Sequence, residues 1–432
     1  MKDLHEMSHR AREAFYRLSA ADIVRRNAAL GTLSELLNKE KESIFSANRL
    51  DLEAAEQTRL SPPLLHRLAF GEEKLRQVTD GLLATAALDD PLNHTLYASE
   101  ITDGLRLYRV SCPIGVIGVI FESRPDALIQ IASLCIKSGN AVLLKGGSEA
   151  MQTNKILCRI VREALASAGL PEDCAQLLET REDVSGMLRE DELIDLIIPR
   201  GSNQFVRYIM DHSRIPVLGH SDGICHVYID EGADLKEAVK ITVDSKAQNV
   251  SVCNAAETLL VHKKIAAAFL PLLADELKAR GVAIRGDAEV QKIIPCEPAT
   301  EDDWSTEYLD YILSVRIIPS LAEAIRHINR YGSHHTDCIV TGNQESAAEF
   351  MQRVDSAGTY WNVSTRFADG FVYGLGAEVG IATGKLHARG PMGLEGLTTY
   401  KYKLLGSGQT MDEMKKGIRN YTHRRLSEDC PL

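Results

Sequence analysis

The chain has 432 residues, of which 44% are hydrophobic and 25% are charged, and its formal net charge at pH 7 is -11. This length predicts two or three domains, and the acidic balance argues against a nucleic-acid-binding protein, which usually carries a basic face. No apolar run reaches the ~18 residues of a membrane span. The first residues, MKDLHEMSHRAREAFYRL, lack the apolar core of a secretory signal, and nine irregularly spaced cysteines favour a reducing compartment. We therefore expect a cytoplasmic, enzyme-sized protein without a membrane partner.

The first hundred residues are predicted to be helical. In AADIVRRNAALGTLSELLNKEKESIFSANRLDLEAAE, for example, apolar residues recur at helical spacing with charged residues between them.

After residue 109 the pattern changes to strands and helices. The run VIGVIFE at 116–122 has the length of a strand, and Pro125 suits the first turn of the helix that follows. AVLLK at 141–145 is a second apolar strand, and the next helix has Ser148 as a candidate N-cap and Gly169 as its stop. Further strand-like runs are CAQLLET, LIDLIIP, IPVLG and ICHVYID. Short apolar strands that alternate with helices predict a parallel, doubly wound sheet.

A second α/β series begins near residue 233, so the boundary between two α/β domains is predicted near residue 230. The expected organisation is, in chain order, a nucleotide-binding domain at 1–230 (with 99–114 as part of an edge hairpin), a catalytic domain at 231–365, and a Gly-rich return segment with a C-terminal oligomerisation strand at 366–432. That strand, TTYKYKLL, is predicted to pair with the hairpin or with a second subunit, and a homo-oligomer is the expected assembly.

One cysteine stands out by its position. Cys253 lies between a predicted helix at 233–243 and a predicted strand at 257–261, and Asn254 follows it. At such a junction, nearby amide dipoles or Lys246 can lower the pKa of the thiol. The arrangement suits covalent catalysis on a carbonyl carbon, in which sulfur attacks and nearby donors hold the oxyanion. A buried structural cysteine is the competing interpretation, because free cysteines are among the most buried residue types.

Glycines follow two predicted strands of the first domain, where parallel sheets bind ligands near helix N-termini. No GxGxxG motif stands there. In its place is LLKGGSEA, in which Lys145 could reach an adenosine ribose or its 2′-phosphate, and Ser148 leaves room for that phosphate. PRGSN at 199–203 would offer amide groups to a phosphate or line a nicotinamide. A tight turn with a solvated lysine is the competing interpretation of the first motif.

Two other patterns concern ligand binding, one of glycines and one of histidines. Residues 370–396 contain eight glycines in 27 residues, which indicates close backbone approach to a ligand or domain, or else a surface loop. The histidines of GHSDGICH and the pair at 334–335 fit no usual zinc spacing, and Cys225 and His226 would point to opposite faces of a strand. We therefore predict no metal site.

Together these segments resemble the gamma-glutamyl phosphate reductases (glutamate-5-semialdehyde dehydrogenases) of the aldehyde dehydrogenase superfamily. The resemblance extends from about residue 10 to about residue 420 and rests on seven motifs in the family's order. They are CPIGVIGVIFESRPDA, LLKGGSEA, IIPRGSNQFV, IPVLGHSDGICHVYID, CNAAETLLVH, STRFADGFVYGLGAEVGI and HARGPMGLEGLTTYKY. It implies an aldehyde dehydrogenase-like fold with two doubly wound α/β domains and a small β oligomerisation element.

The resemblance also implies roles for individual residues. Cys253 becomes the nucleophile, with Asn254 beside it as a weaker oxyanion donor, and Asn362 lies in the family's substrate-side motif. Ser148 stands where NAD-preferring relatives usually carry glutamate, which implies NADP(H) as the cofactor. The cofactor would be held by Lys145, Gly147, Ser148, Gly201, Ser202 and Glu307.

The implied reaction is NADPH-dependent reduction of L-glutamyl 5-phosphate to L-glutamate 5-semialdehyde through a Cys253 thioester, in proline biosynthesis, with glutamate 5-kinase as a pathway neighbour. The stretch VLGHSDG lacks the general-base glutamate of hydrolytic relatives, which suits an enzyme that must protect its thioester from water. Because the substrate is an anion, Arg124, Arg366 and Arg389 are candidates for its phosphate and carboxylate, with structural salt bridges as the alternative. A reductase of a CoA thioester or another acyl phosphate, and a non-catalytic nucleotide-binding protein, are the rival functions.

Overall fold

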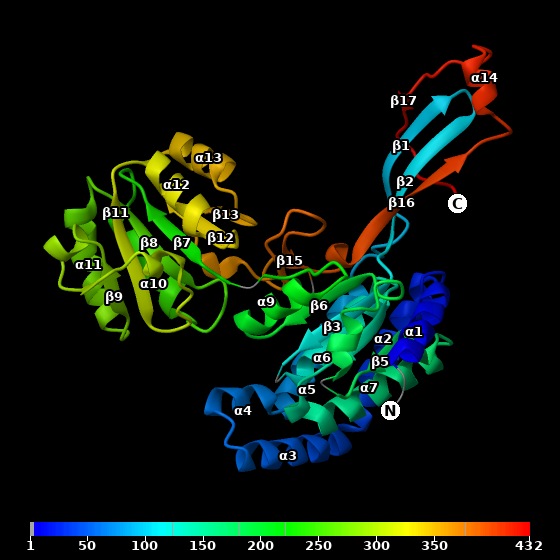
Figure 1. The fold of residues 1–432 in the computed structure, drawn as a ribbon, viewed down its shortest axis with the longest axis horizontal. Coiled ribbons are helices and arrows are strands. Elements are labelled where there is room, and N and C mark those ends of the chain that lie inside the picture. Colours follow the sequence, from blue (N-terminus) through cyan, green and yellow to red (C-terminus); the bar gives the residue numbers. More distant parts are fainter. Residues whose placement is uncertain (1–3, 123, 181, 221, 376) are drawn as a thin grey trace.

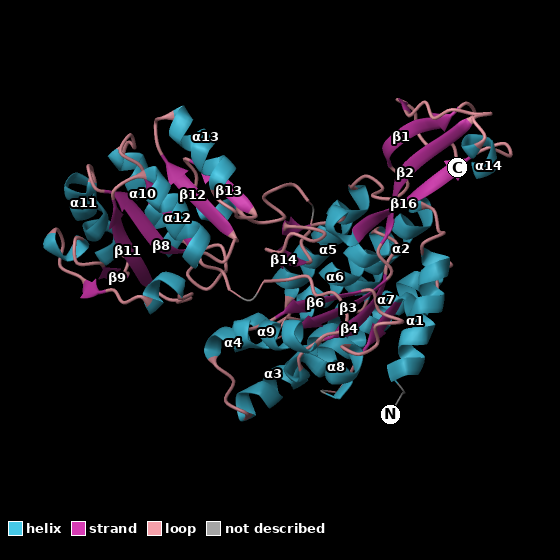
Figure 2. Ribbon diagram, turned by 45° about the horizontal axis from the view of Figure 1, so that its top comes forward, coloured by secondary structure: helices cyan, strands magenta, loops and turns pink. Residues whose placement is uncertain are grey.

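The computed structural model describes residues 4–122, 124–180, 182–220, 222–375 and 377–432. Figure 1 shows two α/β bodies side by side, with an antiparallel β arm projecting beyond the first body and carrying the C-terminus. Figure 2 shows that helices cover the strands of both bodies. None of the described helices is long and apolar enough to cross a membrane.

The chain begins with the predicted helices. They are α1 (Leu4–Leu18), α2 (Ile23–Lys39), α3 (Lys41–Gln57), α4 (Pro62–Leu68) and α5 (Glu72–Ala87). Helix α2 shows why this region is helical. The Asp22 side chain caps it by accepting a hydrogen bond from the Arg25 N–H at 2.9 Å, and Leu30, Leu33 and Leu37 form a fully buried stripe at helical spacing.

The first sheet has four parallel strands in the order β5-β4-β3-β6. The strands are β3 (Val116–Phe121), β4 (Ala141–Lys145), β5 (Ala175–Leu177) and β6 (Leu196–Arg200), and the helices between and after them are α6 (Pro125–Lys137), α7 (Met151–Ser167), α8 (Glu182–Met187) and α9 (Asn203–His212). Helices α2, α6 and α7 pack on one face and α1, α8 and α9 on the other, so the sheet is doubly wound as predicted. Its order reverses between β3 and β6, which is where such sheets bind ligands.

The second sheet has seven parallel strands in the order β10-β9-β11-β8-β7-β12-β13. The strands are β7 (Cys225–Ile229), β8 (Ala256–His262), β9 (Ala283–Gly286), β10 (Glu297–Pro298), β11 (Ile312–Ile318), β12 (Thr336–Val340) and β13 (Gly358–Trp361), and the helices are α10 (Leu235–Ala247), α11 (Ala266–Lys278), α12 (Leu321–Tyr331) and α13 (Gln344–Arg353). Helices α10 and α11 cover one face, and α12 and α13 cover the other.

The position of β7 corrects the predicted domain boundary. We assigned ICHVYID to the first series, but β7 pairs with β8 and β12 at the centre of the second sheet. The boundary near residue 230 was therefore too late, and the crossing between domains precedes Cys225. The apolar pattern could not reveal this, because a strand buried on both faces looks the same in either sheet.

The arm is a four-stranded antiparallel sheet in the order β16-β2-β1-β17. Its strands are β1 (Thr95–Thr102), β2 (Leu105–Pro113), β16 (Thr398–Leu405) and β17 (Arg424–Arg425), and α14 (Met411–Lys415) lies beside them. The predicted hairpin and its pairing with TTYKYKLL are confirmed. The return segment contains β14 (Gly380–Ala382) and β15 (Gly390–Met392), and its Val379, Met392 and Leu397 are buried in the core of the first domain. Part of the Gly-rich segment is therefore core structure rather than a surface loop.

Candidate active site

Cys253 lies in the loop between α10 and β8, at the amino-terminal edge of the second sheet. Its side chain is partly exposed. The part of the chain that leads from α9 in the first domain to β7 in the second is the crossing segment. Its Gly223 lies directly against the cysteine, because a Cβ atom at Gly223 would come within 2.6 Å of the Cys253 Cβ. Only glycine allows this approach, so the crossing segment fixes one wall beside the sulfur.

A second loop supports the cysteine from the other side. The Asn254 amide donates hydrogen bonds to the carbonyl oxygens of Ala368 at 2.9 Å and Arg366 at 3.4 Å, and the Thr365 hydroxyl donates to the Asn254 carbonyl at 2.7 Å. These bonds tie the cysteine loop to the short 3₁₀ helix Thr365–Phe367. The donor side of the Asn254 amide is thus committed to the backbone, so the structure gives Asn254 a positioning contact rather than a free donor.

The pKa of the Cys253 thiol is raised to about 12, mainly by burial and also by the carboxylates of Glu307 and Glu378. The backbone N–H of Cys253 and the Arg200 guanidinium act in the opposite direction. The resting sulfur is therefore a protonated thiol, contrary to the expected activation. Lys246 does not lower this pKa, because its ammonium is fully buried in an ion pair with Glu257 at 2.5 Å.

Two histidines that sequence reasoning did not assign to the site lie beside the cysteine. A nitrogen of His220, a nitrogen of His335 and the sulfur of Cys253 all lie within 4.8 Å of one another. Burial lowers the pKa of both imidazoles, so both are neutral bases. The motifs around them had been noted, but their separation along the chain gave no signal that β12 brings His335 next to the crossing segment.

The structure separates the predicted substrate-binding residues into two groups. Arg366 interacts electrostatically with Cys253 and donates a hydrogen bond from Nε to Gln248 Oε1 at 2.9 Å. Arg124 forms an ion pair with Asp126 at 3.7 Å, which is the salt-bridge alternative considered for it, and its charge repels that of Arg200, which interacts electrostatically with Cys253. Sequence reasoning missed Arg200, although its motif IIPRGSN had been singled out for the neighbouring glycine and serine.

Arg389 and Asn362 have other contacts. The Arg389 guanidinium binds Asp355 at 3.2 Å and the Thr383 carbonyl at 3.3 Å, which is the salt-bridge alternative considered for it. The Asn362 amide accepts from the Thr341 N–H at 2.9 Å and donates to the Thr341 carbonyl at 3.0 Å. Its side chain therefore holds the end of β12 in place.

The predicted nucleotide residues gather where they were expected, at the carboxyl ends of β4 and β6. Lys145 ends β4, and Gly147 and Ser148 follow it in the turn before α7. Gly201 and Ser202 precede α9, and a Cβ atom at Gly201 would come within 2.7 Å of Glu122 Oε2. A Cβ atom at Gly147 would likewise come within 2.1 Å of Glu149 Oε1, so glutamate side chains crowd both glycine turns.

Two observations indicate that this edge fits a nucleotide. The Ser202 N–H at the start of α9 already donates to a carboxylate oxygen of Glu122 at 3.1 Å, which occupies the place an anionic group would take. The fully buried side-chain amide of Asn154, next to Gly146, has no hydrogen-bond partner among the described residues. This amide can therefore still form hydrogen bonds with a ligand at the glycine turn.

Glu307 connects the two domains. Its carboxylate accepts a hydrogen bond from the amide of Asn203 at the first turn of α9. Burial raises the pKa of Glu307, whereas the hydrogen bonds from Asn203 and the Gly223 backbone lower it. Glu307 therefore brings the second domain to the nucleotide edge of the first.

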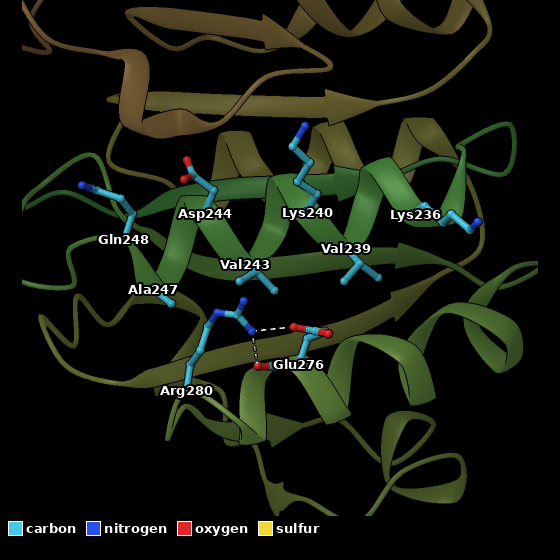
Figure 3. A pocket seen from close by; sticks show the side chains of 9 residues that line it. All are labelled: Lys236, Val239, Lys240, Val243, Asp244, Ala247, Gln248, Glu276 and Arg280. Atoms are coloured by element: carbon cyan, nitrogen blue, oxygen red, sulfur yellow. Dashed lines mark hydrogen bonds and ion pairs between the residues drawn. The ribbon is translucent and has the colours of Figure 1, made fainter.

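A groove of about 490 Å³ lies elsewhere on the second domain, between α10 and α11 (Figure 3). Val239, Val243 and Ala247 form its apolar side, and opposite them Arg280 forms an ion pair with Glu276 at 2.5 Å. The lining contains neither a cysteine nor a histidine. We therefore place the chemistry at Cys253 rather than in this groove.

The family model described as "Aldehyde dehydrogenase family" matches residues 1–292. An acetylating aldehyde dehydrogenase from Geobacillus thermoglucosidasius has the same fold, with a TM-score of 0.65 at 17% identity over 95% of this chain and 99% of that one. Fold and matched region thus define an aldehyde dehydrogenase-type protein.

Two closer relatives narrow the class. The gamma-glutamyl phosphate reductase of Acetivibrio thermocellus is 56% identical over 429 residues, which cover 99% of this chain and 100% of that protein. The solved gamma-glutamyl phosphate reductase of Thermotoga maritima has a TM-score of 0.93 at 40% identity, over 95% of this chain and 100% of that chain. The chain therefore belongs to the gamma-glutamyl phosphate reductases of the aldehyde dehydrogenase family.

Proposed function

We propose that this protein reduces L-glutamyl 5-phosphate to L-glutamate 5-semialdehyde with NADPH and releases phosphate, as a step of proline biosynthesis. Its relatives carry the name of this activity along nearly the whole chain. The observation that carries the chemistry is Cys253 between the two domains, with Arg200 and Arg366 in its electrostatic environment. A nucleophile flanked by guanidinium groups suits an acyl phosphate, whose leaving group is an anion.

The first step is attack of Cys253 on the acyl carbon. The thiol must lose its proton, and His220 is the acceptor we infer. The Nδ1 of His220 donates to the Ile381 carbonyl at 2.9 Å, which leaves the lone pair on Nε2. Because the resting thiol holds its proton tightly, transfer to His220 accompanies the attack instead of preceding it. The carbon–oxygen bond to phosphate breaks, and a thioester on Cys253 remains.

Arg200, Arg366 and Arg124 are the groups we assign to the anionic substrate. Arg366 is held on one side by Gln248, and its remaining donors can meet the phosphate or the α-carboxylate. The backbone N–H of Cys253 is the oxyanion donor, because the Asn254 amide is already committed to Ala368.

Members of the aldehyde dehydrogenase family use nicotinamide cofactors, and we propose NADP(H) for this chain. Lys145, Gly147 and Ser148 would hold the adenosine ribose and its phosphate, Gly201 and Ser202 the pyrophosphate side, and Glu307 the nicotinamide ribose. When bound, the cofactor supplies the hydride that reduces the thioester. His220 then returns its proton to the departing sulfur.

Two carboxylates near the sulfur could instead activate water and hydrolyse the thioester. Both are engaged, because Glu378 accepts from the Gly370 N–H at 2.9 Å and Glu307 accepts from Asn203. We therefore expect phosphate, and not water, to be the acceptor in the reverse reaction.

The test is the reverse reaction, followed by NADPH absorbance with purified protein, NADP+ and glutamate semialdehyde, with and without inorganic phosphate. Strict dependence on phosphate is the expected result. NADPH formation without phosphate would contradict the proposal and identify water as the acceptor. A requirement for CoA would favour the rival acylating dehydrogenase.

We also propose a homo-oligomer assembled through the arm. Strand β16 is the outer strand of its sheet, and its Tyr400, Tyr402 and Leu404 are 50%, 60% and 56% exposed. An apolar outer strand of this kind is a template for pairing with another chain. Light scattering of the protein and of a Tyr402→Lys variant tests this, and a monomeric mass for the unchanged protein would contradict it.

The proposed function also predicts a neighbouring enzyme in the pathway and a cell compartment. Glutamate 5-kinase, which makes an acyl phosphate of this kind, is the expected pathway neighbour. No disulfide bond is present among the described residues, and we propose the cytoplasm, where thiols stay reduced, as the compartment.

A further inference from the structure

The spacing of the histidines along the chain predicted no metal site, but the fold brings His220 and His335 next to Cys253. We propose that these three residues form a Zn²⁺ site, and that zinc bound there reversibly inhibits the enzyme. The inhibitory part rests on the proposed function, because it requires Cys253 to be the nucleophile. The binding part rests only on the geometry of the three side chains.

The geometry suits a tetrahedral metal. Zinc lies about 2.3 Å from sulfur and 2.0–2.1 Å from imidazole nitrogen, which puts neighbouring ligand atoms roughly 3.5 Å apart. The ligand atoms of the three residues lie within 4.8 Å of one another. They therefore have to approach by at most about 1.3 Å, which small side-chain rotations supply.

The second ring nitrogen of each histidine is already oriented, as in known zinc sites. His220 Nδ1 donates to the Ile381 carbonyl at 2.9 Å, and His335 Nδ1 lies 3.0 Å from the Thr336 hydroxyl oxygen. When each Nδ1 is the protonated nitrogen, as the Ile381 carbonyl requires for His220 and the Thr336 hydroxyl allows for His335, both Nε2 atoms are left as ligands. The His335 Nε2 is buried and has no hydrogen-bond partner among the described residues, which is the independent observation that points to a ligand.

The donor set selects the kind of metal. One sulfur and two imidazole nitrogens favour zinc over magnesium or calcium, which prefer oxygen. The guanidinium groups of Arg200 and Arg366 act on the sulfur, and the carboxylates of Glu307 and Glu378 offset their positive charge. The fourth position stays open for water, so the site resembles a catalytic zinc site in its coordination number only.

Cys225 offers a matched control. Its sulfur lies 3.7 Å from His335 Nδ1, whereas the proposed ligand atom of His335 is Nε2. The Cys225 thiol also donates to the Cys253 carbonyl at 3.3 Å. A buried cysteine next to the cluster but outside the ligand set distinguishes specific coordination from general thiol binding.

The test uses Co²⁺ as a spectroscopic probe for Zn²⁺. Folded protein titrated with Co²⁺ is expected to show a thiolate-to-cobalt charge-transfer band, which Zn²⁺ removes. Cys225→Ser should keep the band and Cys253→Ser should lose it. His335→Gln should weaken Co²⁺ binding at least about tenfold, because one of three ligands is gone. Circular dichroism checks that each variant is folded.

Alkylating Cys253 in the unchanged protein gives a second route that needs no substitution, and it too should abolish the band. Absence of the band in the unchanged protein, or its persistence in Cys253→Ser, would overturn the metal site. Turnover should fall with added Zn²⁺ and recover with a chelator. A band without inhibition would overturn the inhibitory role and the nucleophile assignment, while the metal site itself would stand.

Discussion

The two sheets of this enzyme present opposite edges to the same site. The first sheet offers the carboxyl ends of β4 and β6, where the N-terminus of α9 favours an anionic cofactor. The second sheet offers its amino edge, so Cys253 follows the C-terminal end of α10. A helix C-terminus carries partial negative charge and does not stabilise a thiolate. The positive charge near the sulfur therefore comes from Arg200 of the first domain and Arg366 of the return segment.

Replacing Cys253, the proposed nucleophile, should reduce turnover more than any other substitution. We expect Cys253→Ser to reduce turnover by at least about 10⁴-fold, because a serine hydroxyl is a much weaker nucleophile. NADPH binding, measured by fluorescence titration, should survive because it belongs to the other sheet. Normal turnover in this variant would refute the nucleophile assignment.

A substitution in the crossing segment should cause the next largest loss of turnover. Gly223→Ala would drive a methyl group into Cys253 and displace it, and a shift of ~1 Å can cost about 100-fold in rate. Gly219→Ala is the matched control, because its new Cβ would meet nothing nearer than 3.5 Å. The kcat values of the two variants, measured by steady-state kinetics, should differ by that factor. Equal kcat values would show that the contact between Gly223 and Cys253 does not position the sulfur.

Substitutions in the buried pair Lys246 and Glu257 test whether Lys246 stabilises the second domain or also activates Cys253. Both side chains are fully buried. Lys246→Met should lower the free energy of unfolding by about 3–5 kcal/mol, because it leaves the Glu257 carboxylate buried and unpaired.

The double variant Lys246→Met/Glu257→Leu should recover most of that loss. Chemical denaturation of the single and double variants measures both values. A single variant that is stable but inactive would instead restore the activating role first expected of Lys246.

A change at the nucleotide edge should have a smaller effect. Ser148→Glu places a carboxylate beside the proposed 2′-phosphate, so the KM for NADPH should rise about tenfold, equivalent to about 1.4 kcal/mol. NADH should be affected little. Ser148→Gln, which is similar in size but uncharged, is the control, and an equal rise in both variants would indicate a steric cause.

The raised thiol pKa predicts a graded response to pH. With a pKa of about 12 in the resting protein, the thiolate fraction and the rate of iodoacetamide alkylation of Cys253 should increase about tenfold per pH unit across the neutral and mildly alkaline range. Mass spectrometry of the labelled peptide measures this rate. A plateau below pH 9 would mean that the sulfur is activated at rest.

Much of the fold could be read from the sequence, because its signals are local. The apolar runs at β3 and β4, the helix stop at Gly169 and the pairing of β16 with β2 were predicted correctly. The glycines after β4 and β6 also gather at one edge, since parallel strands align their ends.

Tertiary structure decided the rest of the site. Arg200, His220 and His335 reach Cys253 from three separate segments, and their spacing along the chain holds no trace of that meeting. Lys246 is near Cys253 in sequence, yet it pairs with Glu257 because a buried ammonium needs an opposite charge. The sequence by itself therefore determined which elements form and which cysteine we propose as the nucleophile. Only the tertiary structure decided the protonation state of that cysteine, because burial and neighbouring charges set a pKa and both depend on residues far away in the chain.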